Sequence, residues 1–279
     1  MKNNISLYLI ALFVITSATS CTDSSSSDDE VIEQTDNFTN DDSKEGDSTT
    51  DDSTNDESTT DDNNITTILD LFDGTGLSYE LTDDSVIFTT ADLPDHESPY
   101  WEESNPLYAE YDGTNADFNL NPNMIEEKNI VITIPLNPAP AATNESTSLG
   151  PIGVSRNGVV FFNQYAGPDN QPLTFEVNSF DQGAGHPTGT NMYHYHIEPL
   201  SLTEQFGADA FLGLLADGYP VYGPEENGLE ITNDDLDEFH GHTSATEHFP
   251  NGIYHYHITD ADPYLNGNGF YGTPGNISQ

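Results

Sequence analysis

The tetrapeptide Tyr-His-Tyr-His occurs twice in this chain, beginning at Tyr193 and at Tyr254, and it restricts the fold more than any other feature. Aromatic residues that alternate with another residue type are typical of a β-strand, where successive side chains point to opposite faces. The two histidines of each copy are therefore expected on one face of a strand, with the tyrosines on the reverse. The recurrence of so unusual a segment also indicates an internal repeat.

A Gly-His dipeptide precedes each copy, at Gly185-His186 and at Gly241-His242. Imidazoles two residues apart on a strand lie about 6 to 7 Å apart and can converge on one cation, and neutral imidazole is a preferred ligand of zinc and copper. The spacing leaves open whether the ligands build two sites of three histidines or one shared site. The predicted ligands are His186, His194, His196, His242, His255 and His257. The two histidines without a counterpart, His240 and His248, are expected on the surface.

The N-terminus has the features of a secretory signal. Lys2 is followed by an apolar run and by small residues that end at Cys21, which predicts a signal peptide over residues 1–20. The small residues before Cys21 resemble a bacterial lipobox, which implies that this cysteine is lipidated; the alternative is an ordinary cleaved signal with a chance cysteine. Since Cys21 is the only cysteine, the rest of the chain has no disulfide, and a metal site there must use nitrogen and oxygen ligands.

Residues 21–64 are predicted to form a disordered linker, because Ser, Thr, Asn, Asp and Glu cannot bury a core. The segment holds 16 acidic residues against Lys44, and their repulsion favours an extended tether. Its opening, Ser24 to Glu30, resembles the serine-rich acidic signal of bacterial surface lipoproteins. We therefore expect a secreted protein, lipid-anchored in the outer membrane and exposed at the cell surface.

The rest of the chain is also strongly acidic, since 33 of the 49 Asp and Glu residues follow Asn64, against only Lys128 and Arg156. Such a charge argues against nucleic acid as a partner. It suits divalent cations, and oxygen ligands for calcium are available in clusters, although none has the Asp-x-Asp-x-Asp-Gly spacing of a calcium loop. The clusters are Asp83-Asp84, Asp234-Asp235 with Asp237-Glu238, and Asp260 with Asp262. A protein or glycan partner is left undefined.

Residues 65–279 fit one domain, predicted to be mainly β and β-sandwich-like. Two hairpins are expected where Asn157-Gly158 and Asp217-Gly218, which favour a type I′ turn, separate apolar runs. The helical signal is weak and limited to residues 202–206 and 234–239. Further short strands are expected at residues 77–81, 86–90, 130–134 and 174–177 and at both histidine segments.

The domain resembles the YHYH family, which is named for the tetrapeptide, over about residues 89–275. Besides both tetrapeptides, the resemblance includes Leu93-Pro-Asp-His-Glu-Ser-Pro-Tyr-Trp101, Ile132-Thr-Ile-Pro-Leu-Asn137, Leu149-Gly-Pro-Ile-Gly-Val154, Ser179-Phe-Asp181, Asp217-Gly-Tyr-Pro-Val-Tyr-Gly-Pro224 and Leu236-Asp-Glu238. It adds His96 as a candidate residue with a surface or structural role as the alternative. Relatives carry cysteines where Phe239 and Phe270 stand here, so any disulfide of theirs is absent. The resemblance implies a domain and no established activity.

Three functional hypotheses follow. The first is a surface-anchored, histidine-rich domain that binds copper or zinc. The second is a metal-dependent enzyme, either a copper oxidoreductase or a metallohydrolase, with Asp181, Glu198 or Glu238 as a base or an additional ligand. The third is an adhesion or glycan-binding module in which histidines and tyrosines form a hydrogen-bonded core. An open coordination position in a pocket would favour the enzyme, and imidazoles bonded to the backbone through both nitrogens would favour the third hypothesis.

Overall fold

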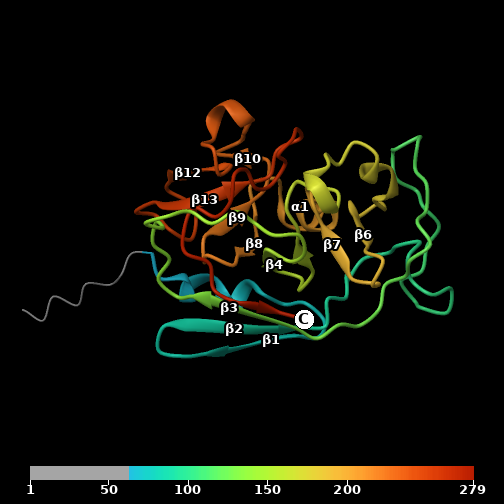
Figure 1. The fold of residues 1–279 in the computed structure, drawn as a ribbon, viewed down its shortest axis with the longest axis horizontal. Coiled ribbons are helices and arrows are strands. Elements are labelled where there is room, and N and C mark those ends of the chain that lie inside the picture. The colour runs from blue at the N-terminus through green and yellow to red at the C-terminus, as the bar shows by residue number, and fades with distance from the viewer. Residues whose placement is uncertain (1–62) are drawn as a thin grey trace, which may run out of the picture. The chain divides into compact units, whose positions relative to one another are not determined.

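Short β-strands make up most of the regular structure in residues 63–279, the part of the chain that the computed structural model describes (Figure 1). The predicted signal peptide, Cys21 and nearly all of the predicted linker lie outside the described residues. Within residues 63–279, no helix is long and apolar enough to cross a membrane.

A four-stranded antiparallel sheet forms one layer. Its strand order is β1-β2-β3-β14, with β1 at Leu77–Leu81, β2 at Ser85–Thr90, β3 at Ile130–Pro135 and β14 at Ile277–Ser278. Every second residue of β2 and β3 is buried, because alternate side chains of a strand share one face. The 3₁₀ helix η1, Ile65–Leu71, begins where the Asn64 side chain accepts a hydrogen bond from the Thr66 amide.

The second layer is an eight-stranded mixed sheet with the order β12-β13-β9-β8-β4-β5-β7-β6. The strands of its first half are β4 (Gly153–Ser155), β5 (Val160–Phe161), β6 (Gly185–Pro187) and β7 (Tyr193–Tyr195). The strands of its second half are β8 (Phe211–Leu215), β9 (Pro220–Tyr222), β12 (Gly241–Ser244) and β13 (Ile253–His257). The predicted strands at both histidine segments are therefore present.

The two halves of this sheet have matching connections. β4 pairs with β8 at the centre; outward from there, β5 lies parallel to β7 and β9 parallel to β13. The outermost pairs are antiparallel, with His186 opposite His194 and His242 opposite His255. The two tetrapeptides therefore occupy corresponding places at opposite ends of the strand order.

Both predicted hairpins are present, β4–β5 and β8–β9, but their turns are not type I′. Gly158 and Gly218 have φ of 89° and 90°, whereas Asn157 and Asp217 are not among the residues with positive φ, which a type I′ turn would require. The Gly158 amide donates to Ser155 and the Gly218 amide to Leu215. Each glycine is therefore the last residue of its turn and has a left-handed conformation, in which a residue with a side chain would be strained.

Helical segments are few and short, as predicted. They are α1 (Leu200–Phe206) and the 3₁₀ turns η2 (Pro168–Asn170), η3 (Glu176–Ser179) and η4 (Asn233–Asp235), and the small ribbon of β10 (Glu225–Glu226) and β11 (Leu229–Glu230) completes the elements. The expected strand at residues 174–177 is wrong. The Val177 amide bonds to the Leu173 carbonyl, so this segment coils into η3.

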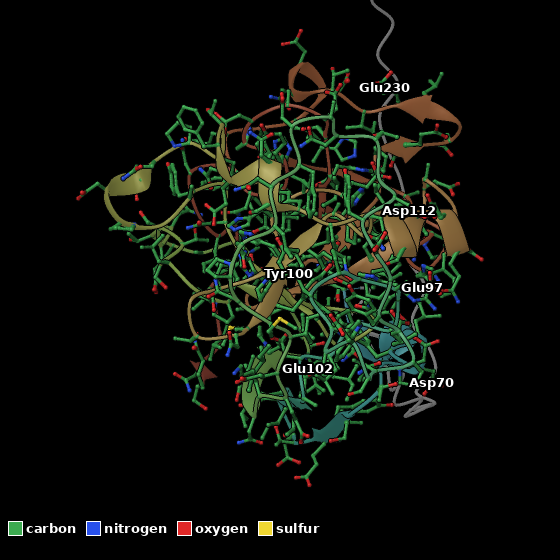
Figure 2. The ribbon with its side chains drawn as sticks, turned by 90° about the vertical axis from the view of Figure 1, so that its right-hand side faces the viewer. Asp70, Glu97, Tyr100, Glu102, Asp112 and Glu230 are labelled. Atoms are coloured by element: carbon green, nitrogen blue, oxygen red, sulfur yellow. The ribbon has the colours of Figure 1, made fainter. Side chains whose placement is uncertain are left out.

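The two sheets share one core, as Figure 1 shows with the smaller sheet below the larger. Phe72, just after η1, joins the layers, because its ring centroid lies 4.7 Å from that of Phe88 and 5.6 Å from that of Phe211. Figure 2 shows carboxylates such as Glu102 and Glu230 at the exposed surface, whereas Tyr100 is buried. The prediction of a mainly β, sandwich-like fold is confirmed.

Candidate metal centres

Four side chains converge at the end of the sheet formed by β6 and β7. Glu176 comes from η3, His186 from β6, His194 from β7, and His196 from the residue after β7. One ligand atom of each lies within 4.8 Å of those of the others. We call this cluster site 1.

The imidazoles of site 1 face one another through their Nε2 atoms. The Nε2 of His194 lies 3.1 Å from that of His186 and 2.9 Å from that of His196. Glu176 Oε1 lies 3.2 Å from the Nε2 of His186. Four donors around one zinc ion at bonds of about 2.0 to 2.1 Å would be about 3.3 Å apart. These separations are therefore close to those of a tetrahedral metal site.

The other ring nitrogen of each histidine in site 1 has a partner that determines the tautomer. The Nδ1 of His194 donates to the Met192 carbonyl at 3.2 Å, and that of His196 donates to the Asn163 carbonyl at 2.5 Å. His186 Nδ1 lies 2.7 Å from Ser179 Oγ and 3.5 Å from Asn121 Nδ2. A neutral imidazole with a proton on Nδ1 has only a lone pair on Nε2. The Nε2 atoms of His194 and His196 therefore face one another without a proton between them.

A second cluster, site 2, lies at the opposite end of the strand order. It consists of Glu226 from β10, His242 from β12, and His255 with His257 from β13. Glu226 Oε1 lies 3.7 Å from the Nε2 of His242 and 3.6 Å from that of His255. As in site 1, each ligand atom lies within 4.8 Å of the others.

Site 2 repeats the tautomer arrangement of site 1. His255 Nδ1 donates to the Ile253 carbonyl at 2.9 Å and His257 Nδ1 to the Gly223 carbonyl at 2.7 Å. The Nε2 atoms of His242, His255 and His257 are all buried without a hydrogen-bond partner. Buried polar atoms normally have a partner, so three orphaned ring nitrogens at one point mark a place that could hold a cation.

Burial keeps four of these imidazoles neutral. It lowers the pKa of His194 well below the usual histidine value, and it lowers the pKa of His196 and of His255 to about 4. The pKa of His257 is also lowered by burial. Metal ions bind the neutral form, so at neutral pH both clusters present donors ready for coordination.

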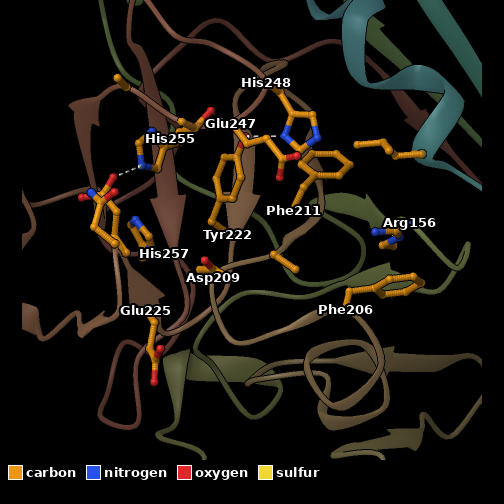
Figure 3. Close-up of a pocket in the computed structure, with 16 residues that line it drawn as sticks. Arg156, Phe206, Asp209, Phe211, Tyr222, Glu225, Glu247, His248, His255 and His257 are labelled. Atoms are coloured by element: carbon orange, nitrogen blue, oxygen red, sulfur yellow. Dashed lines mark hydrogen bonds and ion pairs between the residues drawn. The ribbon is translucent and has the colours of Figure 1, made fainter.

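The surroundings of the two sites differ. The Phe162 ring stacks on His194 with centroids 3.9 Å apart, and Phe180 packs on His186 at 4.8 Å. Site 2 instead adjoins a cavity of about 590 Å³, which Glu226, His255 and His257 help to line (Figure 3). The imidazoles of site 1 are therefore covered by aromatic rings, whereas site 2 borders a cavity.

The tyrosines of both tetrapeptides form hydrogen bonds with polar residues other than the ligand histidines. Tyr193 Oη donates to Asp181 at 2.8 Å, and Tyr254 Oη donates to Asp237 at 2.9 Å. Tyr256 Oη donates to Asp217 at 2.7 Å. Alternation turns these hydroxyls to the face opposite the ligand histidines, where they attach the strands to the preceding loops.

The six predicted histidines are brought together as two sets of three, which answers the question that the spacing left open. His96 lies outside both sets; its Nε2 is 3.3 Å from the hydroxyls of Tyr193 and Tyr195, a structural role. The expectation that His240 lies on the surface is wrong. It is buried, with its Nε2 3.1 Å from Thr259 Oγ1.

The carboxylates of the two sites were not identified from the sequence. Glu176 lies ten residues before His186 and Glu226 sixteen before His242, so no common spacing marks them. The carboxylates proposed instead lie in neither cluster. Asp181 accepts from Tyr193, Glu198 from Thr203 Oγ1 at 2.6 Å, and Glu238 from Asn268 Nδ2 at 3.1 Å.

Calcium at the acidic clusters stays a prediction. Asp84 accepts a hydrogen bond from Ser85 Oγ, and Asp235 accepts from Thr232 in a capping box. These are local contacts within loops, and they leave the carboxylates at the surface.

Comparison with known proteins identifies the family. No curated protein and no solved structure matches the chain. The family described as YHYH protein matches residues 131–230 and 227–269, a range that contains both tetrapeptides and all eight residues of sites 1 and 2. The chain belongs to the YHYH family.

Proposed function

We propose that the protein binds two divalent transition-metal ions, one at each cluster, through three imidazole nitrogens and one carboxylate oxygen. The observation that carries this proposal is the direction of the Nε2 lone pairs. All three in site 2 are buried without a partner, and two in site 1 face each other at 2.9 Å. A shared cation would turn these unfavourable contacts into metal bonds.

Zinc is the ion that the donor set favours. Nitrogen and oxygen donors at near-tetrahedral separations suit Zn²⁺, whereas Cu²⁺ prefers a tetragonal arrangement and Cu⁺ prefers sulfur ligands. Copper remains the competitor, because Cu²⁺ binds most nitrogen sites more tightly than Zn²⁺ does. The test below therefore includes both metals.

The arrangement does not favour the adhesion hypothesis. That hypothesis requires both ring nitrogens to be satisfied by the protein, as in a hydrogen-bonded core. In His255 and His257, Nδ1 has a backbone partner and Nε2 has none. A histidine whose only purpose is packing has no reason to leave one nitrogen buried and unpaired.

We further propose that the two halves of the eight-stranded sheet derive from an internal repeat and that the domain acts outside the cytoplasm, attached to the outer membrane through lipidated Cys21. Matching strand order and matching His186–His194 and His242–His255 pairs support the repeat. The small residues before Cys21 and the acidic segment after it support the anchor. Membrane fractionation of wild-type cells and of a Cys21→Ser strain tests the anchor. Equal release of both proteins would refute it.

Metal analysis of the full-length protein tests the two sites. The protein, purified without chelator and then dialysed separately against zinc or copper, should retain two ions per chain. The double variants H194A/H196A and H255A/H257A should each retain one. His240→Asn is the matched control, because it removes a buried histidine outside both clusters, and it should retain two. Retention of fewer than two ions per chain by the folded wild-type protein would refute the proposal.

A further inference from the structure

The aromatic rings that cover the imidazoles of site 1 are only partly matched at site 2. Phe161 pairs with Tyr195 and Val221 with Tyr256, so Phe162 and Tyr222 hold corresponding positions. Phe162 lies flat on His194 at 3.9 Å, whereas Tyr222 meets His255 edge-on at 5.1 Å. Phe180 packs on two imidazoles of site 1. It precedes Asp181, and the residue before the corresponding Asp237 is Leu236. The sequence difference therefore leaves site 2 less enclosed.

Site 2 forms one end of the cavity, and Arg156 forms the other, as Figure 3 shows. At the first end, Glu226, His255 and His257 line the wall. A volume of about 590 Å³ is within the range of small-molecule sites, which is roughly 300 to 1,000 Å³. A molecule in this cavity would reach both the metal and the guanidinium.

Arg156 is the only arginine in a chain with a net charge of −45. Among residues 63–279 it has no carboxylate partner within the 4.0 Å of an ion pair, despite the abundance of acidic residues. Its Nε is buried without a hydrogen-bond partner, and its guanidinium lies over the Phe206 ring, 3.5 Å from the centroid. Its donors are therefore available to an anionic ligand, and a guanidinium suits a carboxylate well.

The remaining walls restrict the ligand. Phe206, Phe211 and Leu71 provide apolar surface in the cavity, and a compact apolar body would fit there. Besides Glu226, the carboxylates Asp209, Glu225 and Glu247 line the same cavity and would repel a polyanion. These features favour one negative group over several.

We propose that this cavity binds a small organic monocarboxylate, with its carboxylate on Arg156 and an oxygen donor at the other end on the metal of site 2. The inference rests on the proposed metal binding, and it makes site 2 the accessible centre and site 1 a closed, structural one. Glu226, the fourth donor of site 2, lines the cavity, so an incoming oxygen would join the metal there as a fifth ligand, a coordination number that zinc can adopt.

Cobalt-loaded full-length protein tests the inference, because the visible spectrum of Co²⁺ responds to new ligands. The probes are the monohydroxamates of succinic to suberic acid, whose hydroxamate binds metal and whose carboxylate would reach Arg156. Their methyl esters are the uncharged controls. The best-fitting acid should perturb the spectrum and bind roughly tenfold or more tightly than its ester, as charge-assisted hydrogen bonds imply.

Variants separate the two ends of the cavity. Arg156→Gln should abolish the preference for acid over ester while retaining cobalt, and Lys128→Gln, which removes the domain's other cation, should keep that preference. H255A/H257A should retain one cobalt ion and show no spectral response. Arg156→Lys, a milder change, should keep a reduced preference, which guards against misfolding of the glutamine variant.

The outcomes distinguish this inference from the metal proposal. Two bound cobalt ions without a spectral response, or equal binding of acid and ester, would overturn the inference alone. A response that persists in H255A/H257A would place the accessible metal at site 1 and would also overturn it. Failure to retain cobalt at all would overturn both proposals.

Discussion

Removal of metal should lower the free energy of unfolding by an amount that follows from the unpaired nitrogens of site 2. Three Nε2 atoms there are buried without partners. Each unsatisfied buried acceptor costs about 1–3 kcal/mol, so the three together cost about 3–9 kcal/mol in the metal-free state. For a domain of about 200 residues, 1 kcal/mol shifts the Tm by about 2–4 °C. Metal-free protein should therefore melt at least about 6 °C below the zinc-loaded form.

Differential scanning calorimetry of the full-length protein at pH 7.5 measures this shift, first with EDTA and then after stepwise addition of zinc. Magnesium at the same concentration is the control, because it prefers oxygen ligands and should not restore the Tm. In H255A/H257A the zinc-induced shift should fall to the contribution of site 1. If metal analysis shows complete removal of zinc and the Tm does not change, the interpretation of the orphaned nitrogens is wrong.

Three further perturbations test the structure around the sites. Burial lowers the pKa of His240 to about 4, below the unfolded value of about 6.5, so its stabilising contribution is complete above pH 6.5 and is lost as the pH falls towards 4. Urea titrations in EDTA measure this loss. Between pH 7.5 and 5, the free energy of unfolding of His240→Asn should fall by about 2 kcal/mol less than that of the wild type, and equal losses would contradict the assigned burial. Gly185→Ala should cost about 1–3 kcal/mol and weaken metal retention, because a Cβ there would lie 2.6 Å from Tyr193 Oη. Gly189→Ala is the control and should be nearly neutral, because the space around its Cβ position is open. Equal effects of the two variants would refute the packing argument. Tyr256→Phe should cost about 1–3 kcal/mol in chemical denaturation, because buried Asp217 loses its hydroxyl donor. Tyr79→Phe removes only an exposed hydroxyl bond to Asp70 and should cost little, and a neutral Tyr256→Phe would mean that Asp217 finds another donor.

Local patterns predicted the elements whose character depends on adjacent residues. Alternation predicted the histidine strands, and Asn157-Gly158 and Asp217-Gly218 predicted two hairpins at the correct places. The turn type was wrong because the dipeptide does not determine which of its residues takes positive φ. The expected strand at residues 174–177 was wrong because its apolar residues are too few to distinguish a strand from a turn.

Contacts between distant segments could not be predicted in the same way. Glu176 reaches site 1 because residues 173–177 coil, and Glu226 reaches site 2 because β10 lies beside the histidine strands. Neither carboxylate has a marked position relative to its histidines. His240 was expected at the surface because it has no counterpart in the first half, yet loops from residues 257–264 cover it.

The sequence by itself determined that histidines share one face of each strand and tyrosines the other, because that alternation follows from the geometry of a single extended chain. It also determined that the domain offers no thiolate to a metal, because the only cysteine is Cys21. Tertiary structure alone decided that β6–β7 and β12–β13 lie at opposite ends of one sheet, which gathers the histidines in two clusters of three instead of one shared cluster. It also decided which end is closed by phenylalanines and which adjoins a cavity, because pairing between distant strands and the course of the loops depend on the whole core.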